Sequence, residues 1–222
     1  MRTTFSKYLG LLALLCAPAV SHAQQHQPPA APPGIDSALT SPLLLTRLRQ
    51  GGLVLACRHA ITDRSKPDAQ PIDVTDRSRQ RNLSDLGREQ AEALGRNVRA
   101  AAIPIGEVFS SPMYRARETA ETAFGRVVLT SLLWEGQDHR GQFSHLFFSP
   151  VTAGANRVLV THQAMLSAIP GRRQNGVEEG DCYVLAPTAD QKVIVLGVLK
   201  PSDWRTTEPT ESAKPTQGGP RV

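Results

Sequence analysis

The chain has little of what metal centres are built from. It holds three cysteines in 222 residues, and no cysteine, histidine and carboxylate pattern completes a zinc site. His139 and His145 are six residues apart, so they do not share one face of a helix. We therefore expect no metal and no cofactor, and the chemistry must come from the side chains of the chain itself.

The chain also lacks a strong excess of charge. Its 25 lysines and arginines against 20 acidic residues give a net charge of +5, and the basic residues are not interleaved with aromatic ones. This mild balance is compatible with an anionic ligand, and we expect no nucleic-acid partner.

Long hydrophobic runs are missing too, because the apolar stretch at residues 9–17 is too short to span a bilayer. Arg2 and Lys7 precede it, and residues 21–23 supply the small residues that a signal peptidase reads. We expect a signal peptide over residues 1–23, whose removal would leave 199 residues with a net charge of +3. No later segment is apolar enough for a membrane helix, so we expect a periplasmic or secreted protein.

Two cysteines, Cys57 and Cys182, would survive this processing, and both lie on expected strands. An oxidising compartment permits a disulfide between them, provided that their Cα atoms come close enough. We expect two buried free thiols, with a disulfide as the alternative.

The remaining chain divides into a spacer, a body and a tail. Residues 24–40 are rich in proline and have no apolar period, which is typical of an extended spacer. Residues 200–222 are rich in Pro, Thr, Ser and Gly and resemble a mobile tail. The body at 41–199 is long enough for one domain with a sizeable core.

Strand and helix patterns alternate along this body. We expect strands at residues 53–57, 107–110, 127–129, 158–161, 183–185 and 193–198. The expected helices begin at Ser41-Pro42, where Ser41 would cap, at Ser84, at Pro112 and after residue 161. The second carries its apolar face on Leu86, Leu94, Val98 and Ala101. This alternation predicts an α/β fold, a three-layer αβα sandwich with a mainly parallel central sheet.

An arginine and a histidine, Arg58 and His59, directly follow the first expected strand. Open α/β sheets bind their ligands at the carboxyl ends of the strands. A guanidinium grips phosphate through two hydrogen bonds, and a neutral imidazole nitrogen can attack phosphorus. The pair therefore indicates a phosphate-handling site, although a local structural role for both residues is the alternative.

Three further segments carry related residues, namely SSPMYRARETA at 110–120, LWEG at 133–136 and RVLVTHQ at 157–163. Together with Arg58-His59-Ala60, and in this order, they resemble the histidine phosphatase superfamily, which includes phosphoglycerate mutases and many small phosphatases. The resemblance runs from about residue 43 to about residue 199. It implies a phosphoglycerate mutase-like fold.

The resemblance also implies roles for single residues. His59 would carry a phosphohistidine, and His162 would hold the phosphoryl oxygens as a hydrogen-bond donor. Thr62 matches a small hydroxyl residue of the phosphate site. Arg58 and Arg115 each follow a strand end and are the fixed cations that a phosphoryl group needs. Arg117 points to another side of its helix, so we expect it to face solvent or a structural partner.

The general acid is expected to be Glu135, because its apolar neighbours would raise the pKa of its carboxyl by desolvation. An ordinary loop position for Glu135 is the alternative, with Asp63 as the second candidate acid. Gln163 stands after His162, where a phytase-type acid would be an aspartate.

These observations predict an exported, metal-independent phosphomonoesterase that hydrolyses a small phosphorylated substrate through a phosphohistidine on His59. The alternative is a catalytically degenerate relative that binds an anionic ligand without turnover. A mutase is disfavoured because glycolytic phosphoesters are not expected outside the cytoplasm.

Overall fold

The computed structural model describes residues 39–134 and 144–204. The expected signal peptide, nearly all of the spacer, Glu135 and His139 lie outside these residues, as does the tail from residue 205 on. No helix within the described part of the chain is both long and apolar enough to cross a membrane.

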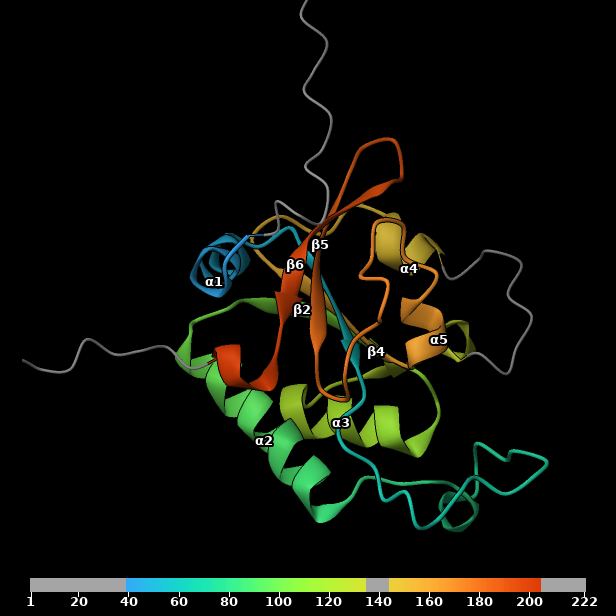
Figure 1. Ribbon diagram of the computed structural model, residues 1–222. Helices are drawn as coiled ribbons and strands as arrows, with labels where there is room; N and C mark the ends of the chain where they lie inside the picture. The colour runs from blue at the N-terminus through green and yellow to red at the C-terminus, as the bar shows by residue number, and fades with distance from the viewer. Residues whose placement is uncertain (1–38, 135–143, 205–222) are drawn as a thin grey trace, which may run out of the picture. The chain divides into compact units, whose positions relative to one another are not determined.

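A six-stranded sheet forms the centre of the folded region, with the strand order β3-β2-β4-β1-β5-β6 (Figure 1). The first four strands in this order run parallel, whereas β5 and β6 are antiparallel to their neighbours. The strands are β1 (Val54–Arg58), β2 (Ile105–Ser110), β3 (Val128–Leu129), β4 (Asn156–Thr161), β5 (Cys182–Pro187) and β6 (Val193–Leu199). The predicted mainly parallel sheet is confirmed, and β4 is buried along its whole length.

Helices cover both faces of this sheet, which gives the predicted three layers (Figure 1). One face carries α1 (Ser41–Gln50), α2 (Asp85–Ala100) and α3 (Tyr114–Phe124), and the other carries α4 (Ser144–Phe148) and α5 (Gln163–Leu166). Short 3₁₀ helices lie at η2 (Arg77–Arg79), η3 (Ser131–Leu133) and η4 (Pro201–Trp204).

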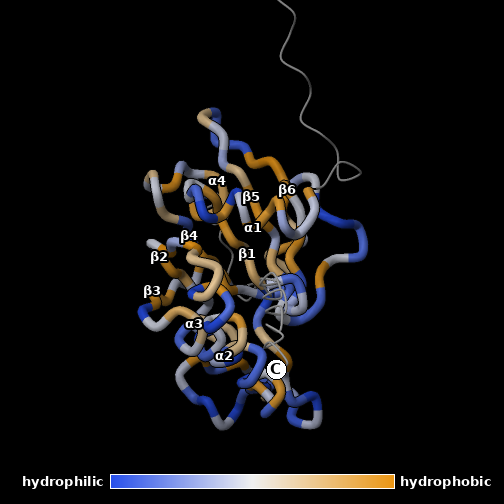
Figure 2. The backbone as a smooth tube through the Cα atoms, turned by 90° about the vertical axis from the view of Figure 1, so that its left-hand side faces the viewer, coloured by the Kyte–Doolittle hydropathy of each residue, from blue (hydrophilic) through white to orange (hydrophobic). Residues whose placement is uncertain are grey.

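The side chains of β1 alternate between the two helical layers. Leu55 and Cys57 pack in the core beneath α1, α2 and α3, whereas Val54 and Ala56 pack on the side of α4 and α5. Figure 2 shows the hydrophobic segments gathered along the strands. The sheet is thus buried on both faces, and its strand ends remain as the place where polar side chains can gather.

The start of α2 is fixed against the segment that follows β1. The Ser84 hydroxyl accepts the backbone N–H of Gly87, as the predicted cap requires. Gly87 leaves room for the Ile61 carbonyl, with which a Cβ at this position would collide. The helix therefore lies directly beside residues 59–62.

Three details of the expected helices are wrong. Leu86 is 64% exposed, because a spacing of eight residues from Leu94 turns it about 80° away from the buried face. The helix after Pro112 begins at Tyr114 instead. Ser41 already lies inside α1, and no side chain caps that helix.

The expectation of free thiols is also wrong, because Cys57 and Cys182 form a disulfide. The two residues are directly opposite each other on the antiparallel strands β1 and β5. This register brings together two positions that are 125 residues apart in sequence. The disulfide therefore links the residue before Arg58 to the residue after Asp181.

The folded region extends past both expected boundaries. The backbone N–H of Leu39 donates to the Leu196 carbonyl, so the spacer ends two residues early. At the other end, η4 buries Trp204 in the core beside α1 and α2, although the tail was expected from residue 200. A single large aromatic side chain therefore anchors residues 201–204 to the body.

Candidate active site

Two histidines meet where neighbouring parallel strands end. Arg58, at the end of β1, pairs in register with Thr161, at the end of β4. His59 and His162 are the next residues along each strand, and the centroids of their rings are 5.5 Å apart. The rings are almost fully buried, with 2% and 3% of each residue exposed.

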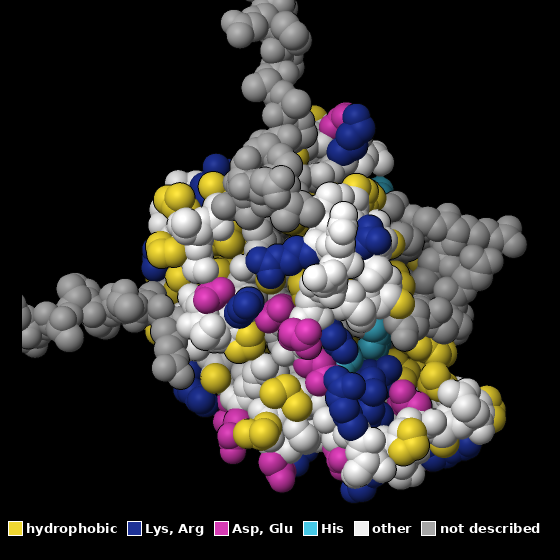
Figure 3. Space-filling model, in the orientation of Figure 1, with side chains coloured by type: hydrophobic (Ala, Val, Ile, Leu, Met, Phe, Trp, Pro, Cys, Tyr) yellow, Lys and Arg dark blue, Asp and Glu magenta, His cyan; other side chains and the backbone are white. Residues whose placement is uncertain are grey.

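The third strand of the group brings Arg115 to the same edge. β2 pairs with β4, and the chain then continues through Ser111 into α3, whose first turn carries Arg115. A cavity of about 350 Å³ opens there, lined by Arg58, His59, Arg81, Arg115, His162, Gln163 and Ala164. Figure 3 shows basic side chains clustered beside histidine at one place on this face, with acidic side chains next to them.

His59 is held in one tautomer. Its Nδ1 lies 2.9 Å from the Ala60 carbonyl oxygen, and because a carbonyl only accepts, Nδ1 carries the proton. Burial lowers the pKa of His59 to about 3, and the charges of Arg115 and Arg58 also lower it, against the opposing effects of the Ala60 carbonyl and Glu179. At neutral pH the ring is therefore uncharged, with a lone pair on Nε2.

His162 is held through its other nitrogen. Its Nε2 lies 2.8 Å from the Ser111 hydroxyl, which itself accepts the backbone N–H of Met113. That hydroxyl can donate its proton to Nε2, which leaves the ring proton on Nδ1. Burial, followed by the charge of Arg115, lowers the pKa of His162 well below its usual value. Nδ1 is buried and has no hydrogen-bond partner among the described residues.

Arginines supply the positive charge of the site. The Nη1 of Arg58 donates to the Val177 carbonyl at 2.9 Å, which fixes the guanidinium. The Nε atoms of Arg58 and Arg81 are buried without a hydrogen-bond partner in the described part of the chain. A tetrahedral oxyanion would offer acceptors to these groups and to the Nδ1 of His162.

Arg115 has an acidic neighbour. Its Nη1 lies 3.1 Å from Oδ1 and 3.2 Å from Oδ2 of Asp68, and Asp68 also accepts the backbone N–H of Arg81. The Thr119 hydroxyl donates to the Arg115 carbonyl and accepts the backbone N–H of Ala60. The first turn of α3 is thus tied to the residue after His59.

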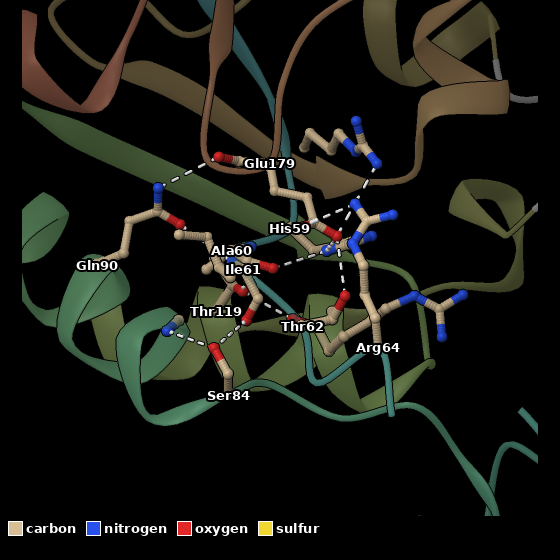
Figure 4. A network of polar contacts seen from close by, with 12 residues as sticks. His59, Ala60, Ile61, Thr62, Arg64, Ser84, Gln90, Thr119 and Glu179 are labelled. Atoms are coloured by element: carbon tan, nitrogen blue, oxygen red, sulfur yellow. Dashed lines mark hydrogen bonds and ion pairs between the residues drawn. The ribbon is translucent and has the colours of Figure 1, made fainter. Parts of the chain in front are cut away.

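A carboxylate from the loop before β5, which pairs with β1 on the side away from β4, also lies beside His59. The Oε1 of Glu179 accepts the Thr62 hydroxyl at 2.9 Å and lies 4.0 Å from the Nδ1 of His59. Figure 4 shows this side chain between His59, Thr62 and Arg64. Burial raises the pKa of Glu179, but the Thr62 hydrogen bond and the nearby positive charges outweigh burial and leave the pKa below its usual value. Glu179 is therefore ionised.

The structure brings together four of the six predicted site residues around the cavity, namely Arg58, His59, Arg115 and His162. Thr62 is buried and turned toward Glu179 instead, and Glu135 lies outside the described residues. Arg117 pairs with Glu121 on the same helix, as expected of a structural partner.

The second candidate acid, Asp63, is not at this cavity. It lines a separate one with Lys66, Arg77 and Asn82. Hydrogen bonds from Ser65 lower the pKa of Asp63, which is opposite to what a general acid needs.

The sequence reasoning missed Arg81, Asp68 and Glu179. Arg81 and Asp68 belong to a long polar loop whose path no periodicity reveals. Glu179 comes just before β5, and the antiparallel register of Cys57 with Cys182 places its loop opposite Arg58 and His59. A prediction that β5 runs antiparallel to β1 would have indicated that Glu179 lies near His59.

Comparison with known proteins gives a family match. Residues 54–136 match the family described as histidine phosphatase superfamily (branch 1). The predicted recognition is thereby confirmed at the level of similarity, because this part of the chain matches the model of the histidine phosphatase superfamily. No curated protein matches the chain significantly.

The fold is similar to that of one solved structure, the protein histidine phosphatase SixA complexed with tungstate, with a TM-score of 0.50 at 14% identity, covering 69% of this chain and 99% of that one. A putative phosphohistidine phosphatase SixA from Agrobacterium tumefaciens has a TM-score of 0.48 at 19% identity, covering 67% and 97%. A phosphoserine phosphatase from Entamoeba histolytica has 0.45 at 14% identity, covering 68% and 98%.

Proposed function

We propose that this protein is an exported phosphomonoesterase that hydrolyses a small phosphate ester through a phosphohistidine intermediate on His59. The observation that carries the proposal is the state of His59. Its Nδ1 proton is held by the Ala60 carbonyl, and its pKa is about 3. Its Nε2 lone pair is therefore available at neutral pH, in a cavity lined by arginines.

The arginines take the part that a metal ion plays in other phosphoryl-transfer sites. The guanidinium groups of Arg58 and Arg115 line the cavity in which charge would spread over the phosphoryl oxygens. His162 adds a neutral donor through its Nδ1. The structure of SixA with bound tungstate, itself an oxyanion, supports oxyanion binding by this fold. We therefore propose that turnover needs no metal and persists in EDTA.

Covalent trapping tests the nucleophile. Brief incubation with a radiolabelled aryl phosphate, followed by denaturation, should leave a label that acid removes and base does not. His59→Ala should remove this label, while His145→Ala, at an exposed histidine, should keep it. Phosphate binding by calorimetry without any label in the parent protein would favour the non-catalytic alternative instead.

The proton donor is proposed to be Glu135, since Asp63 lines a different cavity. A general acid matters most when the leaving oxygen is a strong base. Glu135→Gln should therefore slow hydrolysis of an alkyl phosphate far more than that of 4-nitrophenyl phosphate. Equal slowing of both substrates would remove Glu135 from this role.

We propose export because residues 1–23 have the sequence pattern of a signal peptide. Expression of the full chain in a Gram-negative host, followed by osmotic shock, should release a protein whose first residue is Gln24. A full-length chain that stays with the cytoplasmic fraction would contradict export without touching the proposed chemistry.

A further inference from the structure

A buried carboxylate lies beside the proposed nucleophile, in a site otherwise suited to anions. The Glu179 side chain is 8% exposed, and its Oε1 is 4.0 Å from the Nδ1 of His59 and 3.9 Å from the Nη2 of Arg58. Its Oε2 is 3.5 Å from the Nη2 of Arg64. A negative charge here opposes the binding of phosphate. Its position is therefore unfavourable for substrate binding and calls for another role.

The loop that carries Glu179 is tied to the catalytic segment by its backbone. The N–H of Gly180 donates to the His59 carbonyl at 3.0 Å, and the N–H of Arg58 donates to the Asp181 carbonyl at 2.9 Å. Gln90 donates from its side chain to the Glu179 carbonyl at 3.2 Å (Figure 4). The disulfide follows at once, at Cys182. The carboxylate is thus held in place and is not a loose surface group.

The proposed reaction creates a charge for which this carboxylate is suited. The Nε2 lone pair of His59 forms a bond to phosphorus while the ester P–O bond breaks, and the leaving oxygen keeps that electron pair and takes a proton from the general acid. Because Nδ1 keeps its proton, the ring of the intermediate is positively charged. Water then attacks phosphorus and gives a proton to the conjugate base of the general acid, while the P–N bond breaks and its electron pair returns to Nε2. The buried ring is therefore neutral, cationic and neutral again within one turnover.

We propose that Glu179 is a positioning residue whose charge stabilises the cationic ring of His59 during phosphoryl transfer. The role rests on the proposed function and deepens it. Arg58 and Arg115 disfavour a positive ring, and Glu179 is the carboxylate within 4.0 Å of that ring among the described residues. Its charge has opposite effects on the two stages, because it weakens binding of the phosphate anion and favours the step that makes the ring positive.

This opposition gives a test that a purely structural role would fail. Glu179→Gln removes the charge but keeps an oxygen that can accept the Thr62 hydroxyl. Rapid-quench labelling with an aryl phosphate should show His59 phosphorylation slowed by about 10- to 100-fold, as loss of one charge at this distance and depth implies. The inhibition constant of inorganic phosphate should fall at the same time. Glu178→Gln, the exposed neighbour with the same change of charge, should alter neither quantity.

Each other outcome overturns the role. An unchanged labelling rate would show that the charge does not act on the ring. Weaker phosphate binding together with slower labelling would show that Glu179 only holds Arg58. If the glutamine variant does not fold, Glu179→Asp is measured instead, and it must slow labelling without weakening phosphate binding. A parent protein that never labels overturns the proposed function itself, whereas equal labelling of parent and Glu179→Gln overturns only the role of Glu179.

Discussion

The ends of β1 and β4 are two versions of one local structure. Both strands are buried and parallel, they pair in register at Arg58 and Thr161, and each is followed by a histidine. Burial lowers the pKa of both histidines. Position in the sheet thus gives the two rings the same depth and the same neutral state.

Their hydrogen-bond partners make them different. His59 donates from Nδ1 to a carbonyl and has the Glu179 carboxylate nearby. His162 contacts the Ser111 hydroxyl through Nε2. A ring fixed as a donor at Nδ1 offers a lone pair at Nε2, while a ring supported by a hydroxyl at Nε2 can offer an N–H at Nδ1. The loops beyond the strands therefore separate a proposed nucleophile from a proposed donor.

The variant His59→Ala tests the proposed difference between the two histidines and should have the largest effect. We expect kcat for an aryl phosphate to fall by about 10⁴-fold or more, because loss of a nucleophile removes the covalent path altogether. Circular dichroism should show an intact fold. A variant that still turns over at the parental rate would show that β1 and β4 do not differ in the way described.

Arg115→Ala tests what the two strand ends share, since the charge of Arg115 acts on both rings. We expect a lower kcat/KM that corresponds to a loss of about 3–4 kcal/mol of transition-state stabilisation, the size seen for loss of a preorganised electrostatic donor. Arg117→Ala, two residues along the same helix and paired with Glu121, is the matched control. An undiminished rate in Arg115→Ala would remove this residue from the site.

The sequence predicted the strand ends because that information is local. A buried apolar run followed by a polar residue marks both a strand and its end, so Arg58, His59 and His162 could be placed without knowing the rest of the fold. Arg115 was placed by the same reasoning from β2. The α/β class followed from alternation of strands and helices, which the structure confirms.

What the sequence did not predict depends on pairing between distant segments. Alternation of apolar residues does not give the direction of a strand, so the antiparallel course of β5 was not foreseen. As a result, the Cys57–Cys182 disulfide was given only as the alternative to free thiols, and the approach of Glu179 to His59 was missed. The contact of Asp68 with Arg115 was missed because a long loop brings it there.

The variant His162→Ala tests the proposed role of the second histidine as a hydrogen-bond donor. If His162 donates a hydrogen bond to the phosphoryl oxygens, its removal should lower kcat by about 10²-fold, near the lower end for such donors because the ring is neutral. The label on His59 should still form, only more slowly. Complete loss of labelling with retained phosphate binding would exchange the proposed roles of the two rings.

The smallest expected effect concerns burial, which the two strand ends share. An unfolded histidine titrates near pH 6.5, but the folded pKa of His59 is about 3. Between these values the unfolded chain binds a proton that the folded chain does not, so stability is highest above pH 6.5 and falls as the pH is lowered toward 3. The slope contributed by His59 is about 1.4 kcal/mol per pH unit.

Urea unfolding at a series of pH values between 7 and 4 measures this slope. His59→Ala should make the curve flatter by that amount, and His162→Ala should also flatten it, because burial lowers both pKa values even though the partners of the rings differ. Carboxylates other than Glu179 also titrate in this range, but their contribution cancels in the difference between variant and parent. A slope that changes in one variant alone would mean that the two strand ends differ in depth as well as in their partners.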